Sequence, residues 1–135
     1  DAPMPQIQLL VIDSIGEMNA FYPVADLVFV GASLADHGGH NIVEPLSLGR
    51  PVVMGPSTYG IDFAAKPAGQ AGAFESLPGA VALEERIVEL LADPLTLARM
   101  SAAAVAFTVD KTGAAEKTFL SLYPLLKSMT EGHRE

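Results

Sequence analysis

The sequence predicts an α/β fold, a Rossmann-like parallel sheet with helices on both of its faces. Three observations lead to this prediction. Short apolar runs of strand length alternate with helical segments, the connections between them are short, and glycines and polar residues gather directly after the apolar runs. Strands that alternate with helices form βαβ units, whose strands are parallel. Ligands of such sheets bind beyond the carboxyl ends of the strands, so the loops that follow the strands are the candidate site.

Four short apolar runs predict the strands. The run from Gln6 to Ile12 is apolar on both alternating faces, which predicts a strand that is buried on both sides. The runs "ADLVFVGAS" and "PVVMG" predict the second and third strands, and a glycine follows each apolar stretch. "GAFESL" predicts a fourth strand at an edge of the sheet. Three loops therefore follow strands at one edge of the sheet: 13–16, 31–39 and 55–60.

Three helices are predicted between these strands. A short helix begins near Glu17, and "HNIVEPLSL" predicts a second short helix. Gly49 ends this second helix, since glycine is the usual residue directly after a helix C-terminus. The third helix covers Asp62 to Ala71, although it contains a proline and a glycine.

The C-terminal part is predicted to be helical throughout. Asp93 and Pro94 form a cap and first-turn pair, which predicts a helix from Pro94 to about Phe107. A last helix begins at 112 or 113, and Pro124 kinks or shortens it. Apolar stripes mark the core-facing sides of the helices on either flank: Leu83, Ile87, Leu90 and Leu91 in one, and Phe119, Leu122, Tyr123 and Leu126 in the other.

Length and composition predict one soluble globular domain over residues 1–135. Half of the residues are hydrophobic and only 18% are charged, which indicates a packed core rather than a disordered chain. We expect residues 1–6, with two prolines, to be a linker and residues 129–135 to be a frayed polar tail. Because the chain begins with Asp1 rather than Met, we expect it to be a fragment of a longer polypeptide.

The charge balance and the missing cysteines exclude several functions. The net charge is −8 and the eight Lys and Arg residues are scattered, so the chain offers no basic stripe for nucleic acid or anionic lipid. No apolar run approaches the roughly 18 residues that span a bilayer. Without cysteine there is no disulfide or thiolate chemistry. A small anionic ligand remains possible if backbone N–H groups hold it.

The segment Gly38-Gly39-His40-Asn41 is the first candidate for such a site. Glycines permit positive φ angles and close backbone approach, so successive N–H groups can converge on an anion. The predicted helix that follows adds free amides at its N-terminus. Glu44, about one turn into that helix, could accept hydrogen bonds from a pair of ribose hydroxyls.

A purely structural interpretation competes with this site. Asn41 and Glu44 have the spacing of a capping box, in which two side chains satisfy each other's backbone amides. Ser14 and Glu17 repeat this spacing after the first predicted strand. One such pair is ordinary, whereas two pairs at neighbouring strand ends would direct two helix N-termini and two glutamates at one crevice. The local sequence leaves both interpretations open.

Other chemistries lack their motifs. No histidine pair or clustered carboxylate array appears, so we expect no metal site and no cofactor. No G-x-S-x-G elbow or Cys–His pair exists for acyl-transfer hydrolysis. No G-x-G-x-x-G follows the first predicted strand, so the dinucleotide fingerprint is missing.

At this point the motifs resemble a known family. "DSIGEM", followed by "ADLVFVGASLADHGGHNIVEPLSLGRPVVMGP" and Phe63, is similar to the C-terminal half of the 3-deoxy-D-manno-octulosonic acid (Kdo) transferases, over about Leu10 to Phe63. The resemblance implies the two-domain GT-B glycosyltransferase architecture, of which this chain would be the donor-binding half. It implies transfer of Kdo from CMP-Kdo to the lipid A precursor (lipid IVA) in lipopolysaccharide core synthesis, with inversion at the anomeric carbon.

The resemblance also implies site residues. The family's nucleotide contacts lie in its x-G-E and N-x-x-E motifs, and we expect further donor contacts in the loop before the second motif. The CMP-binding residues are therefore Ile15, Gly16, Glu17, Asn41, Ile42, Val43 and Glu44, and the possible further contacts are Gly38, Gly39 and His40. No catalytic residue is expected in this chain, since the family's base is a glutamate of the N-terminal domain.

That missing domain would also bind the acceptor and carry the membrane anchor of many members. We therefore expect the full-length enzyme at the cytoplasmic side of the bacterial inner membrane, and the isolated chain to be inactive.

Two positions depart from the family pattern. The strand-end loop reads Gly31-Ala32-Ser33 where the family often has G-G-S, and Ser57 stands where a histidine often follows Gly-Pro. The role of the loop from residue 55 to 60 is therefore open. Two rival functions are the donor domain of another GT-B enzyme that uses a UDP- or GDP-sugar, and a non-catalytic α/β module.

Overall fold

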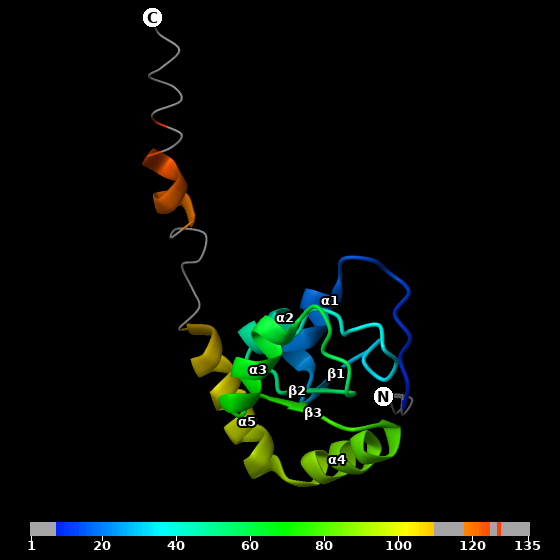
Figure 1. Ribbon diagram of the computed structural model, residues 1–135. Coiled ribbons are helices and arrows are strands. Elements are labelled where there is room, and N and C mark those ends of the chain that lie inside the picture. The colour runs from blue at the N-terminus through cyan, green and yellow to red at the C-terminus, as the bar shows by residue number, and fades with distance from the viewer. Residues whose placement is uncertain (1–7, 110–117, 125–126, 128–135) are drawn as a thin grey trace, which may run out of the picture.

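The computed structural model describes residues 8–109, 118–124 and 127, and its centre is a three-stranded parallel sheet. The strands lie in the order β1 (Val28–Val30), β2 (Val52–Met54) and β3 (Phe74–Ser76) (Figure 1). Val30 lies opposite Met54, which lies opposite Ser76, so the three carboxyl ends are level. The predicted Rossmann-like parallel sheet is confirmed, and β3 lies at an edge as expected.

Helices alternate with the strands and continue after them. They are α1 (Met18–Phe21) with a 3₁₀ turn η1 (Tyr22–Val24), α2 (Val43–Ser47), α3 (Asp62–Gln70), α4 (Ala80–Ala92) and α5 (Pro94–Val109). Residues 118–124 are also helical. No single helix of this described part has the length and apolarity to cross a membrane; α4 and α5 reach that length only as a pair bent by 100°.

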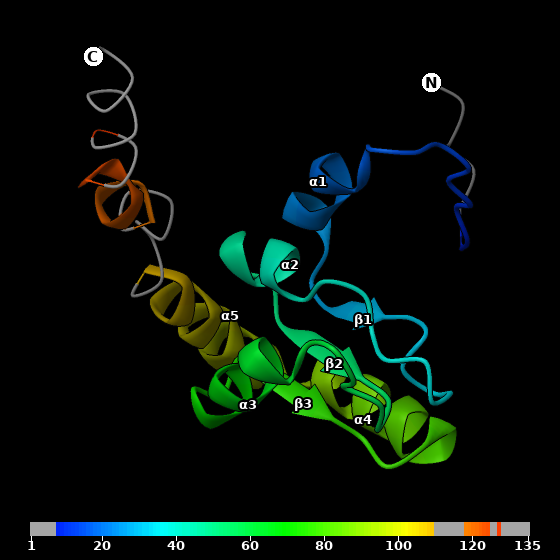
Figure 2. The ribbon, with the colours of Figure 1, turned by 45° about the horizontal axis from the view of Figure 1, so that its top comes forward.

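Helices cover both faces of the sheet, as predicted. On one face, the buried side chains of β1 and β2 pack with residues of α2, α3 and the second half of α5, including Leu46, Ala68 and Phe107. On the other face, Val53 packs with Leu83 and Leu90 of α4 and with the first half of α5. Figure 2 shows α4 on one side of the strands and α2 on the other.

The ends of the helices follow the local sequence. Gly49 has φ 70° and its N–H donates to the carbonyl of Leu46, which ends α2. Asp93 Oδ1 accepts hydrogen bonds from the N–H groups of Leu95 and Thr96, so the predicted cap of α5 is confirmed. In the apolar stripe of α4, Leu83 and Leu90 are buried but Leu91 is exposed, because the helix turns it away from the sheet. The start of the last helix and Leu126 lie outside the described residues.

The first predicted strand is not formed. Residues 8–12 contain no strand, and Leu9, Leu10, Val11 and Ile12 are exposed. Gln6 itself lies outside the described residues. Apolar alternation predicts which segments tend to be buried, but a strand also needs a neighbour for its N–H and C=O groups. In this structure the segment has no such neighbour, and the prediction is wrong over residues 8–12.

Candidate functional site

A pocket of about 440 Å³ lies between β1, the α1–η1 segment and the loop that enters α2. Its volume is in the range of small-molecule sites. One wall is apolar and comes from β1, Met18 and Tyr22, and the other wall is polar. The lining residues are Met18, Tyr22, Val28, Phe29, Val30, Gly31, His40, Asn41 and Glu44. Three predicted site residues, His40, Asn41 and Glu44, therefore meet at one pocket.

Asn41 connects Glu44 to the backbone at the start of α2. Its Oδ1 accepts a hydrogen bond from the N–H of Val43 (2.9 Å), and its Nδ2 donates to Glu44 Oε1 (3.0 Å). The first of these bonds uses the N–H of Val43, whereas a capping box uses the N–H of Glu44, and Ile42 at the N-cap position of α2 has no side-chain capping bond. Glu44 bonds the side chain of Asn41 and not its backbone N–H, so neither half of the predicted capping box is formed. Both side chains stay exposed to solvent, where a ligand can reach them.

Ile42 and Val43 lie between these polar residues, and their side chains differ in burial. The Ile42 side chain is fully buried in the core under the sheet, so only its backbone can face a ligand. Val43 is partly exposed beside Asn41. The segment is thus anchored by Ile42 and presents Asn41 and Glu44 outward.

The two glycines before His40 pack tightly against the loop that follows β2. Gly38 has φ 74°, and a Cβ there would lie 2.2 Å from the carbonyl oxygen of Tyr59. A Cβ at Gly39 would lie 1.8 Å from Met54 Cε. The N–H of Gly38 donates to Ser57 Oγ (3.0 Å). A ligand contact at this amide therefore requires that Ser57 release it.

Ser33 is the centre of a hydrogen-bond network between the two strand-end loops. Its hydroxyl is buried, donates to the carbonyl of Val30 (2.7 Å) and accepts from the N–H of Gly55 (2.9 Å). Its carbonyl accepts from the N–H of Ser57 (3.0 Å). A Cβ at Gly55 would lie 2.5 Å from the Ser33 carbonyl oxygen, so only glycine fits there. The loop from 55 to 60 thus supports the loop that carries His40 and Asn41.

The sequence drew attention to Ser33 and Ser57 only as parts of loops that depart from the family pattern, and it predicted no role for either side chain. Their position directly after strands was a further signal, because parallel topology predicts that these loops are neighbours.

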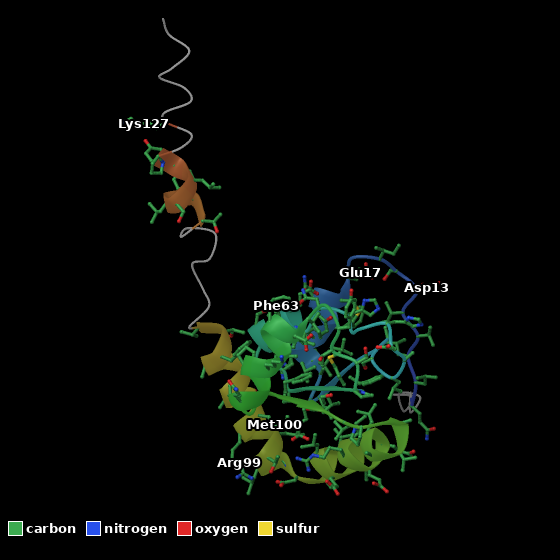
Figure 3. All side chains as sticks on the ribbon, viewed as in Figure 1. Asp13, Glu17, Phe63, Arg99, Met100 and Lys127 are labelled. Atoms are coloured by element: carbon green, nitrogen blue, oxygen red, sulfur yellow. The ribbon has the colours of Figure 1, made fainter. Side chains whose placement is uncertain are left out.

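The segment Ile15-Gly16-Glu17 lies outside the pocket. Its three residues are exposed and none of them lines the pocket, although the next residue, Met18, does. The Ser14 hydroxyl donates to the Glu17 carboxylate, and Glu17 precedes α1 without a side-chain capping bond. Figure 3 labels Glu17 of this segment, and Asp13 shortly before it, at the outside of the molecule. The predicted capping box of Ser14 and Glu17 is therefore not formed, because their side chains bond each other.

The electrostatics of the pocket come from one carboxylate and short helices. Burial and the negative charge of Glu44 raise the pKa of the Tyr22 phenol, which stays a neutral hydroxyl at pH 7. Helices α1 and α2 have only four and five residues, so the partial positive charge at each N-terminus is smaller than the predicted anion site would need. Within the described ranges, no group of three or more His, Cys, Asp or Glu residues could hold a metal ion.

Two known proteins to which this chain is similar carry the same name. No family model matches the sequence. The 3-deoxy-D-manno-octulosonic acid transferase of Bordetella pertussis is 39% identical over 120 residues, which cover 89% of this chain and 28% of that protein. The protein of the same name from Haemophilus influenzae is 31% identical over 128 residues, which cover 94% of this chain and 30% of that protein. The chain thus spans less than a third of the length of these relatives.

A solved structure is similar to this chain in both fold and sequence. It is the C-terminal CMP-Kdo binding domain of WaaA from Acinetobacter baumannii, with a TM-score of 0.67 and 30% sequence identity. The match covers 72% of this chain and 51% of that one. Together these similarities show that the chain belongs to the Kdo transferase family of glycosyltransferases and corresponds to one segment of its members.

Proposed function

We propose that this chain is the donor-binding domain of a Kdo transferase and holds the CMP part of CMP-Kdo. The observation that carries the proposal is the similarity, in fold and at 30% sequence identity, to a domain that binds CMP-Kdo. The exposed Asn41 and Glu44 beside a pocket of suitable volume support it, since their oxygen and nitrogen atoms can bond ribose hydroxyls and a base.

In the proposed complex, the residues of both motifs surround the nucleotide. Glu44 accepts hydrogen bonds from the ribose hydroxyls, and backbone N–H groups bind the phosphate. The contacting residues are Ile15, Gly16, Glu17, Asn41, Ile42, Val43 and Glu44, with Gly38, Gly39 and His40 as further contacts. Amides that are held in place before the reaction stabilise the charge that develops on the departing CMP.

We assign the other parts of the reaction to another domain of the enzyme. We propose that a base in another domain activates the acceptor hydroxyl, which attacks the anomeric carbon of Kdo with inversion. The acceptor is the lipid A precursor, and the whole enzyme works at the cytoplasmic side of the inner membrane. The similarity to proteins named Kdo transferases supports the transfer of Kdo.

Titration of the chain with CMP, followed by NMR, tests the proposal. We expect the backbone resonances of Gly16, Glu17, Asn41 and Glu44 to shift at millimolar CMP, and less with UMP or GMP. If UMP or GMP binds as well as CMP, another nucleotide-sugar donor is favoured. If no nucleotide moves these resonances, the proposed site is wrong and the non-catalytic alternative stands.

Glu44→Gln separates ligand binding from helix capping. Glutamine keeps an oxygen that can accept from Asn41 but loses the charge, so we expect unchanged thermal stability and CMP affinity about tenfold weaker. Glu85→Gln, on the exposed side of α4, is the matched control and leaves affinity unchanged. Unchanged affinity in Glu44→Gln contradicts the ligand role.

A further inference from the structure

Arg50 lies at the amino ends of the strands, whereas Asn41 and Glu44 lie on the side of the carboxyl ends. It stands between Gly49, which ends α2, and the start of β2, and its side chain is partly buried. Its Nη1 donates a hydrogen bond to the carbonyl of Ala25 (3.0 Å). Its Nε is buried and has no hydrogen-bond partner among the residues that the structure describes. Buried N–H groups nearly always have a partner, so this atom requires an explanation.

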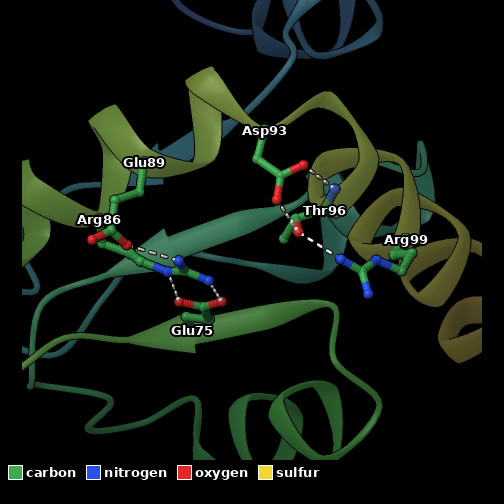
Figure 4. A network of polar contacts seen from close by, with 6 residues as sticks. All are labelled: Glu75, Arg86, Glu89, Asp93, Thr96 and Arg99. Carbon is green, nitrogen blue, oxygen red and sulfur yellow. Dashed lines mark hydrogen bonds and ion pairs between the residues drawn. The ribbon is translucent and has the colours of Figure 1, made fainter.

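A second arginine of the same molecule shows which partner these atoms bind. The Nε and Nη2 of Arg86 donate to the two carboxylate oxygens of Glu75 (2.7 and 2.8 Å), as Figure 4 shows. Two parallel N–H groups match the planar shape of a carboxylate. In Arg50 the hydrogen bond to Ala25 uses Nη1, and the described residues give no partner to Nε or Nη2. The side of the guanidinium that binds a carboxylate in Arg86 is therefore unpaired in Arg50.

Arg50 lines a pocket of about 240 Å³ between the connections that enter β1 and β2 and the first half of α5. This volume is below the roughly 300–1,000 Å³ of sites for drug-sized ligands, so it suits a small molecule. No residue of β1 itself lines the pocket, and β2, which begins beside it, has a strand on each side. The lining residues are Asp26, Arg50, Pro51, Pro94, Leu97, Ala98 and Ser101.

Hydrogen bonds hold the walls of this pocket in place. The N–H of Arg50 donates to the carbonyl of Pro45 in α2 (3.0 Å). The hydroxyl of Ser101, in α5, donates to the carbonyl of Gly49 (2.6 Å) and so joins the helix to the residue before Arg50. Pro51, directly after Arg50, is fully buried. The arginine is thus held by α2, α5 and β2 together.

The charges at the pocket indicate which anion fits. Among the side chains that line it, only Arg50 is cationic, and the exposed Asp26 adds a negative charge. The proton of the Ser101 hydroxyl is already donated to Gly49, so Arg50 is the donor that remains for a ligand. One guanidinium balances the single charge of a carboxylate. A phosphate group carries about −1.5 to −2 at pH 7 and would leave excess negative charge beside Asp26.

We propose that this pocket, the Arg50 pocket, binds a small monocarboxylate. The two carboxylate oxygens accept from Nε and Nη2 of Arg50, and the rest of the ligand lies against Pro94 and Leu97. Binding includes a small rotation of the guanidinium, because Nε is covered in this structure. Asp26 can accept a hydrogen bond from a hydroxyl or ammonium group of the ligand. The site is separate from the proposed nucleotide site, and neither depends on the other.

NMR titration of the 135-residue chain with sodium acetate, without nucleotide, tests the proposal. Sodium chloride at the same concentrations is the comparison, since it gives the same ionic strength without a carboxylate. We expect the Nε–H resonance of Arg50 to shift with acetate and to saturate with a Kd of about 10 mM, as one charge-assisted pair provides. The backbone amides of Leu97 and Ala98 should shift with the same Kd. The Nε–H of Arg86, already paired with Glu75, should not move.

Arg50→Lys tests the geometry of the site separately from its charge. Lysine keeps the positive charge but lacks the two parallel N–H groups, so we expect acetate to bind at least about fivefold more weakly. The amides of Leu97 and Ala98 report this binding. The matched control is Arg99→Lys, at an exposed position of α5, which should leave the Kd unchanged. If Arg50→Lys does not fold, the Nε–H titration of the unmodified chain still decides.

Three outcomes overturn the proposal. The first is an Arg50 Nε–H resonance that acetate does not move up to about 100 mM. The second is an equal shift with chloride, which would mean a response to salt and not to a carboxylate. The third is acetate binding that appears only in Asp26→Asn, which would make Asp26 the partner of Arg50 in solution. No nucleotide is present in these experiments, so each of these outcomes leaves the proposed function standing.

Discussion

Ser33 shows how one small side chain fixes the position of a site that it does not enter. Ser33 is buried in the core, and its hydroxyl satisfies both the carbonyl of Val30 and the N–H of Gly55. A residue without a hydroxyl leaves these two backbone groups without that partner. The loops after β1 and β2 would then lose a shared anchor.

Ser33→Ala should therefore destabilise the protein. We expect the free energy of unfolding to fall by about 2 kcal/mol, because a buried N–H and a buried carbonyl each lose a hydrogen bond. Urea denaturation followed by circular dichroism measures it. The matched control is Ser47→Ala, whose exposed hydroxyl donates to the Glu44 carbonyl and should cost about 0.5 kcal/mol or less. Equal losses in the two variants contradict the role of Ser33.

Asp93 gives a pH dependence at the start of α5. The hydroxyl of Thr96 and then the N–H groups of Thr96 and Leu95 lower the pKa of its carboxyl (Figure 4). Because the folded pKa is below the unfolded one, the stabilisation is fully present above about pH 3.9 and is lost as the pH falls through the folded value.

Asp93→Ala should lower the Tm at pH 7, and the difference from the unmodified chain should shrink below about pH 4. Thermal melts across this pH range measure it, with Glu84→Ala on the exposed side of α4 as control. A Tm difference that does not change with pH contradicts the assignment.

At the scale of elements, α4 is joined to β3 by an ion pair, whereas its apolar contacts with the sheet are with Val53 of β2. The Arg86 guanidinium donates hydrogen bonds to the carboxylates of Glu75 and Glu89, which raise its pKa, Glu75 more than Glu89, so it stays charged at all working pH values. Both Arg86 and Glu75 are about one-third exposed, so solvent screens part of their attraction. The two-oxygen geometry with Glu75 is nevertheless more favourable than a single contact.

A double-mutant cycle with Arg86→Gln and Glu75→Gln should give a coupling energy of about 1 kcal/mol. The pair of Arg86 and Glu89 lies on one helix with Glu89 65% exposed, and its coupling should be about 0.3 kcal/mol. Urea denaturation at low and high salt measures both couplings. Two equal couplings would mean that the link between β3 and α4 adds nothing beyond a surface contact.

The helix ends were predicted correctly because they depend on residues that are close together in the sequence. Asp93-Pro94 predicted the start of α5, and Gly49 predicted the end of α2, because caps depend on the nearest few residues. The strand over residues 6–12 was predicted from its own apolar pattern, yet strand formation depends on a neighbour that the pattern does not contain. Leu91 was assigned to the buried side by spacing, but the helix turns it away from the sheet and it is exposed.

At the scale of the whole molecule, the chain spans less than a third of the length of two relatives. It covers 28% and 30% of two relatives named Kdo transferases. We expect the 135-residue chain to show no transfer of Kdo from CMP-Kdo to a lipid A precursor, because we assign the acceptor site and the catalytic base to another domain. A radiolabelled transfer assay, with the Bordetella pertussis relative as positive control, measures it. Transfer above the blank contradicts this division of roles.

The residues of the candidate site could be predicted from the sequence, but the hydrogen bonds that hold their loops in place could not. The motif around Asn41 and Glu44 was visible in the sequence, and the structure places both residues at one pocket. The hydrogen bonds of Ser33 with Gly55 and of Gly38 with Ser57 join residues that are far apart in the chain. Such contacts depend on the strand alignment, which no local pattern specifies.

The hydrogen bond from the Gly38 amide to Ser57 has a consequence for how the loops respond together. An anion that binds the amide of Gly38 must first displace the Ser57 hydroxyl, so ligand and loop compete for one donor. Occupancy of the first loop would then free the second loop, which also contacts α3 through Thr58 and Asp62. A change in the second loop, at a distance from any ligand, would alter affinity at the first. Ligand binding at the first loop would thus be coupled to greater mobility of the second loop.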